Sequence, residues 1–140
     1  MASRRRSREL AFQMVFQWDL HPSSLEDANV INVFWKEQAQ SSDDNRGHFE
    51  VLVRGVAANL PKIDKSLESV LKNWKMSRVD KVDLAVLRIA TYELLFQSPD
   101  DRPDRAVVIN EAVEISRKFG NKGSPQFVNG ILDALHEPTN

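Results

Sequence analysis

The stretch VDKVDLAVLRIATYELLF, residues 79–96, decides the fold of this protein. Its apolar residues recur with helical spacing, and on a wheel of about 100° per residue they surround nearly the whole circumference. A helix that is apolar on nearly all sides belongs in the middle of a bundle. Ser77, with Asp80 three residues later, has the pattern of a capping box, so we expect this central helix over residues 78–97.

The segments on both sides of the central helix carry apolar residues at the same i, i+3, i+4 spacing, and they lack sustained strand-like alternation. The sequence therefore predicts an all-α fold, a compact bundle of six to seven helices. The other expected helices are 5–20, 24–40, 46–60, a segment from Pro61 through Trp74, one that follows the polar loop 98–105 and ends at Phe119, and one from Ser124 through Leu135.

Five residues mark the expected helix ends. Ser24 is the expected N-cap of the second helix and Ser124 that of the last, where Pro125 takes the first helical position. Pro61 should break or kink the chain between two helical segments. Gly120 is expected to close the preceding helix in the left-handed conformation.

Length and composition are those of an ordinary globular domain. The 140 residues, 41% hydrophobic and 28% charged, are enough for one domain spanning 1–140. The absence of cysteine excludes disulfides and thiolate chemistry. No apolar run approaches the ~20 residues of a membrane span, and the basic start leads into an amphipathic segment. We therefore expect a cytoplasmic protein with no membrane segment.

No pattern in the sequence indicates catalysis, a metal or a cofactor. The histidines lack the spacing of a metal site: His21, His48 and His136. Ser124, in GNKGSPQF, has the order of neither a phosphate loop nor a nucleophile elbow. Glu93 lies on an apolar arc of the central helix, where a tuned acid and a buried, paired carboxylate are both possible; the second is favoured. We expect a protein that is not an enzyme.

Four arginines stand at the start of a chain whose net charge is −1: Arg4, Arg5, Arg6 and Arg8. One interpretation is a solvated, frayed terminus. Against it, the wheel of helix 5–20 places Phe12 and Phe16 outside the core arc, with Arg5 between them in angle. Aromatic and cationic side chains on a face that the core does not need are typical of a binding surface for RNA or for a protein.

A second basic and aromatic group surrounds the start of the last helix, whose free amide groups favour anions. It consists of Lys122, Gln126 and Phe127. Phe127 lies at the edge of its apolar stripe, so both core packing and stacking on an unpaired base remain open for it.

Three segments together resemble the NusB family of transcription antitermination factors. They are RRRSRELAFQMVFQWDL at 4–20, VDKVDLAVLRIATYELLF at 79–96, and VVINEAVEISRKFGNKGSPQFVNGILD at 107–133. Their order and spacing match the family across essentially the whole chain. The resemblance implies two small helical sub-bundles within a single RNA-binding domain, 1–140.

The resemblance also implies a non-catalytic function. NusB proteins pair with NusE, which is ribosomal protein S-ten, and bind the boxA element of single-stranded RNA in nascent ribosomal RNA transcripts. The pair helps the RNA polymerase antitermination complex read through terminators. The implied RNA-binding residues are Arg4, Arg5, Arg6, Arg8, Lys122, Gln126 and Phe127. The expected protein-partner residues are Phe12, Phe16 and Asp83; the family usually has tyrosine at the position of Phe16, and Asp83 is shorter than glutamate.

Two alternatives from other classes stay open at the level of sequence. One is a protein-only helical adaptor, in which the arginines meet an acidic partner. The other is a module associated with an RNA methyltransferase. A homodimer that buries the arginine face is also compatible with the sequence.

Overall fold

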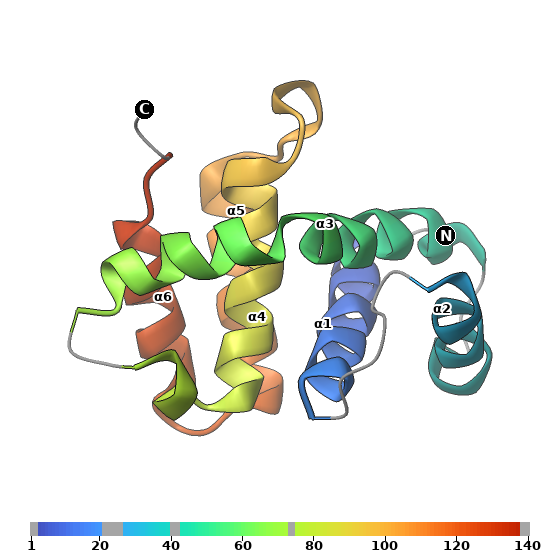
Figure 1. Cartoon of the computed structure of the whole chain (residues 1–140), viewed down its shortest axis with the longest axis horizontal. Helices are drawn as coiled ribbons and strands as arrows, with labels where there is room; N and C mark the ends of the chain where they lie inside the picture. The colour runs from blue at the N-terminus through green and yellow to red at the C-terminus, as the bar shows by residue number, and fades with distance from the viewer. Residues whose placement is uncertain (1–2, 21–26, 40–42, 73–74, 138–140) are drawn as a thin grey trace.

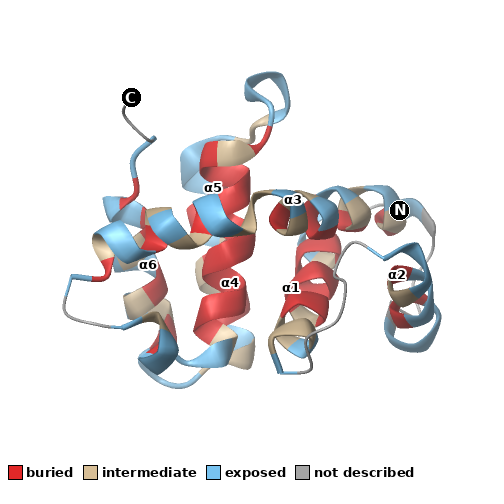
Figure 2. Ribbon diagram, viewed as in Figure 1, coloured by how far each residue is buried: buried red, intermediate tan, exposed pale blue. Residues whose placement is uncertain are grey.

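The central helix is present, and it is the most buried element of the protein. In the computed structural model, which describes residues 3–20, 27–39, 43–72 and 75–137, α4 spans Lys81–Thr91 and continues as a π-helical turn, Tyr92–Phe96. Every residue from Asp83 to Leu95 is buried, and α4 packs against α1, α3, α5 and α6 (Figure 2). The predicted position in the middle of the bundle is confirmed.

The described residues form six α-helices and no strand, which confirms the all-α prediction. The helices besides α4 are α1 (Arg4–Leu20), α2 (Ala28–Phe34), α3 (Arg46–Val70), α5 (Arg105–Phe119) and α6 (Ser124–Ala134). A second π-helical turn, Trp35–Ala39, follows α2, and short 3₁₀ turns lie at Asp43–Asn45, Met76–Arg78 and Pro99–Asp101.

The helices form two groups that share α3 (Figure 1). On one side, α1 and α2 pack on the first part of α3, where the Phe49 ring lies 5.6 Å from Phe34 and 5.0 Å from Trp35 between centroids. On the other side, α4 and α6 contact its second part, and α5 packs on α4 and α6. This arrangement agrees with the two sub-bundles that the family resemblance implies. No helix among the described residues is long and apolar enough to span a membrane.

Pro61 does not interrupt α3 or start a new helix, so the predicted division of this stretch into two helices is wrong. The helix runs through it from Arg46 to Val70, so the predicted second segment is part of α3 and ends before Trp74, which lies outside the described residues. Pro61 is exposed, so water can bond the Ala57 carbonyl that lacks an amide donor.

Two predicted N-caps are replaced by aspartates. The Asp80 carboxylate accepts hydrogen bonds from the amides of Val82 (2.9 Å) and Asp83 (3.4 Å), so α4 begins at Lys81 rather than at residue 78. Ser77 lies in the preceding 3₁₀ turn. Likewise Asp27 caps α2, which begins at Ala28; the predicted cap Ser24 lies outside the described residues. The ionised carboxylate is a strong acceptor at a helix start.

The turn between α5 and α6 depends on Gly120 for space rather than for a left-handed backbone. Its φ of −91° and ψ of −168° are extended, so the predicted left-handed cap is wrong. A Cβ at this position would lie 2.4 Å from Ser124 Oγ and 2.7 Å from the Ser116 carbonyl oxygen. Ser124 is the first residue of α6 rather than its N-cap; its hydroxyl accepts from the Asn121 amide at 3.0 Å, and Pro125 stands in the first turn.

Candidate nucleic-acid interface

Ion pairs join the arginine-rich start of α1 to α5. Arg5 donates from Nε and Nη2 to the two carboxylate oxygens of Glu111, at 2.8 and 3.0 Å. Glu9, whose side chain is 9% exposed, accepts from Arg6 and from Lys118, each at 3.3 Å. These contacts place a basic stretch of α1 against a helix from the other end of the sequence.

Three of the four predicted arginines lie at the surface. Arg4 is exposed, 54% of the Arg5 side chain is accessible, and Arg6 is half-buried. Their positions are compatible with contacts to an external anion. The frayed-terminus interpretation does not describe them, because α1 is helical from Arg4 and Ser7 donates to the Asn45 carbonyl at 3.1 Å.

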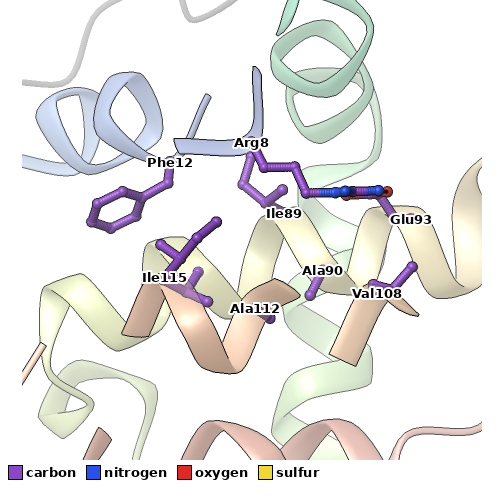
Figure 3. A pocket seen from close by; sticks show the side chains of 9 residues that line it. Arg8, Phe12, Ile89, Ala90, Glu93, Val108, Ala112 and Ile115 are labelled. Atoms are coloured by element: carbon purple, nitrogen blue, oxygen red, sulfur yellow. Dashed lines mark hydrogen bonds and ion pairs between the residues drawn. The ribbon is translucent and has the colours of Figure 1, made fainter. Parts of the chain in front are cut away.

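Arg8 lies in the interior instead. It donates from Nε and Nη2 to the two carboxylate oxygens of Glu93, both at 2.8 Å, and the two side chains are 6% and 1% exposed (Figure 3). Burial opposes the charged guanidinium, but the hydrogen bonds and charge of Glu93 raise the pKa of Arg8. The favoured interpretation of Glu93 as a buried, paired carboxylate is confirmed. Arg8 has no surface to offer a ligand, and its helical position explains this, since it precedes buried Phe12 by one turn.

The aromatic face predicted to be free is covered by α5. Phe12 is 3% exposed, its ring centroid lies 5.2 Å from that of Phe119, and it lines a small pocket with Ile115 (Figure 3). The prediction that the core does not need Phe12 is therefore wrong. Phe16 stacks on Phe12 at 6.2 Å between ring centroids and stays half-buried, so this part of the face remains accessible.

The start of α6 carries the second predicted group. Lys122 and Gln126 are exposed, whereas Phe127 is half-buried and packs against the core, so core packing accounts for at least part of its surface. Asp83, the predicted partner residue, is buried: its Oδ1 has no hydrogen-bond partner within the described part of the chain. Burial raises the pKa of Asp83, against a hydrogen bond with Ser124 that lowers it.

Sequence reasoning missed the α5 residues that hold the arginines. Glu111, Ile115 and Lys118 follow one another at i, i+4 and i+7 and so form one stripe of the helix. That spacing indicates a common face. It does not indicate that α1 lies opposite, which only the packing of the two helices shows.

His48, on α3, lies close to the charges of Arg4 and Arg8 and keeps a neutral ring. Burial lowers its pKa to about 4, with help from both arginines, and Nδ1 is buried with no partner in the described residues. In the unfolded chain His48 has the ordinary histidine pKa of about 6.5, so on acidification the unfolded state binds a proton before the folded state does. The free energy of unfolding therefore decreases as the pH falls from that value to about 4, the pKa in the folded protein. We expect thermal melting of His48→Gln to depend less on pH over that range, and an NMR titration of the wild type to give a midpoint near 4 rather than an ordinary histidine value.

Comparison with known proteins identifies the family. The NusB family matches residues 5–137. The transcription antitermination protein NusB of Trichlorobacter lovleyi is 44% identical over 135 residues, covering 96% of this chain and 91% of that protein. The protein of the same name from Geobacter sulfurreducens is 42% identical over 135 residues, with 96% and 94% covered.

Solved structures share the fold. T. maritima NusB superposes with a TM-score of 0.76 at 33% identity, over 95% of this chain and 90% of that one. A chain from the structure of antitermination factors NusB and NusE in complex with dsRNA superposes with a TM-score of 0.79 at 23% identity, over 94% of this chain and 93% of that one. This match shows that the two chains share a fold. The family match and the two relatives, each covering nearly the whole chain, show that this protein belongs to the NusB family of transcription antitermination proteins.

Proposed function

We propose that this protein is a transcription antitermination factor that binds boxA RNA of nascent ribosomal RNA transcripts together with NusE, ribosomal protein S-ten. It acts as a non-catalytic adaptor, in the cytoplasm where the transcripts are made. Its family and its full-length relatives support antitermination. The structure of a NusB with NusE and dsRNA, whose fold this chain shares, supports the choice of partners.

The observation that carries the RNA part of this proposal is a groove of about 300 Å³ between the start of α1 and the last turns of α5. Its walls combine cations of both helices, and the lining residues are Arg5, Glu9, Glu114, Ile115, Arg117 and Lys118. Arginine forks bind phosphate through paired N–H groups. Arg4 and Arg6 extend the cationic surface along α1.

Lys122 and Gln126 continue the proposed RNA surface beyond α5. Lys122 follows Lys118 by four residues and is exposed, as is Gln126 in the first turn of α6. Phosphate contacts from these cations would set the position of the strand, and polar contacts to base edges would supply preference. Phe127 contributes through its exposed portion, and Arg8 is left out because it is buried against Glu93.

For NusE we propose a surface around Phe16. It is the accessible aromatic residue of the face on which Phe12 is buried. Asp83 is buried and forms a hydrogen bond with Ser124, so its contribution is to hold the start of α6 in place. A shared RNA site explains how a chain with a net charge of −1 can take part in binding RNA, because the partner supplies part of the positive surface.

The test is a fluorescence-anisotropy titration of a short boxA single strand at several salt concentrations, with and without NusE. Arg5→Ala/Arg6→Ala should lower the salt slope by about 1 to 1.5, from ~0.7 per phosphate contact on single strands. Lys62→Ala/Lys65→Ala removes the same charge from exposed positions in the second part of α3 and should keep the wild-type slope.

NusE should tighten binding of the wild type. If the arginine variant keeps the wild-type slope and affinity while NusE still binds, the basic start is not the RNA site, and the protein-only adaptor is favoured. If the wild type with NusE binds no RNA, the proposed function is wrong.

A further inference from the structure

Within the part of the chain that the structure describes, the hydrogen bonds to the guanidinium of Arg5 lie along one of its edges. Nε and Nη2 each give one N–H to Glu111, at 2.8 and 3.0 Å. A guanidinium has five N–H donors in a rigid plane, so three remain at its far end: two on Nη1 and one on Nη2. With 54% of the side chain exposed, this second edge can receive a phosphate without releasing the carboxylate.

Glu111 is itself anchored on α5. Its side chain is only 16% exposed, and it stands one turn before Ile115, which is buried against the other helices. The hydrogen bonds from Arg5 lower the pKa of Glu111, so the carboxylate is ionised at neutral pH. A fixed acceptor of this kind determines the plane in which the guanidinium lies.

We propose that Glu111 is a positioning residue for RNA: it holds Arg5 so that the free edge of the guanidinium faces the phosphate. This inference rests on the proposed function, since it concerns the same groove. It assigns an acidic residue of α5 a favourable role in binding a polyanion.

Two effects of the carboxylate oppose each other. Its negative charge repels phosphate, but the guanidinium stands between the two anions, so its positive charge is nearer to the phosphate than the carboxylate is, and attraction falls off with distance. A free arginine, by contrast, must lose the freedom of a long side chain when it binds. Glu111 holds the Arg5 side chain in place before RNA binds, so the entropy that RNA binding would otherwise lose is already lost. The gain from this positioning is larger than the repulsion between Glu111 and the phosphate.

The sign of the effect tests this inference. Glu111→Gln keeps the size of the side chain but removes the second oxygen that Arg5 needs, and we expect RNA affinity to fall about threefold to tenfold, as for the ordering of one flexible side chain. Glu114→Gln is the matched control: it removes the same charge from the same helix, but Glu114 forms its ion pair with Arg117, at 3.6 Å, and acts on Arg5 through its charge alone. That variant should bind RNA equally well or more tightly.

A double-mutant cycle separates positioning from a general structural effect. In an Arg5→Ala background, Glu111→Gln should no longer weaken binding, because the group that it orients is gone. All variants are measured with NusE present, and their melting temperatures are compared with that of the wild type.

The inference is overturned if Glu111→Gln tightens RNA binding as Glu114→Gln does, or if it weakens binding to the same extent with and without Arg5. Both outcomes leave the proposed function intact as long as the wild type binds the boxA strand with the expected salt dependence. Loss of that wild-type binding would remove the proposed function itself.

Discussion

Glu93→Gln is expected to lower the free energy of unfolding by about 3–5 kcal/mol, the range for breaking one partner of a buried ion pair. Arg8 cannot reach water from its position, since its side chain is 6% exposed, and it would lose half of a bidentate contact that joins α1 to the turn after α4. Chemical denaturation measures the loss directly, and the melting temperature should fall by at least about 10 °C.

The control is the exposed ion pair that Arg5, also on α1, forms with Glu111. Arg5→Ala breaks an equally bidentate contact, but the Arg5 side chain is 54% exposed, so its loss should cost far less stability than the loss of Glu93. Replacing both buried partners, as Arg8→Met/Glu93→Leu, should destabilise less than Glu93→Gln because no unpaired charge remains. Wild-type stability in Glu93→Gln would contradict a structural role for the pair.

Gly55→Ala is the second substitution with a large expected effect. Gly55 lies on α3 where the ring of Tyr92 crosses it, and a Cβ would come within 2.2 Å of that ring. Tyr92 is only 9% exposed, so the ring has little space into which to move. We expect a loss of about 1–3 kcal/mol, typical of overpacking in a core.

Gly47→Ala provides a control with the opposite sign. Gly47 lies in the same helix, is exposed, and would have no neighbouring heavy atom within 4 Å of the new Cβ. Alanine there should stabilise the protein by roughly 0.5–1 kcal/mol, since glycine disfavours the helix. Equal effects of the two substitutions in urea denaturation would show that the contact between Gly55 and Tyr92 is not tight.

Helix ends were predicted less well than helices. The apolar periodicity of 79–96 indicated the buried central helix, because burial on all sides leaves a pattern in the residues themselves. The cap is Asp80 rather than the predicted Ser77, because the position of a cap depends on the local backbone path. For Pro61, the exposed side of α3 tolerates a missing hydrogen bond that a buried position would not.

The sequence by itself determined the helical class, the central position of α4 and the clustering of cations at the start of α1, because composition and periodicity are properties of a single segment. It did not distinguish Arg5, which is exposed and forms an ion pair with Glu111, from Arg8, which is buried and forms an ion pair with Glu93. A helical wheel gives the angle of a side chain about its own axis, whereas burial and ion pairing depend on which other helix lies at that angle. Only the packing of α4 and α5 against α1 decided which arginines remain at the surface and which are buried in ion pairs that hold the fold together.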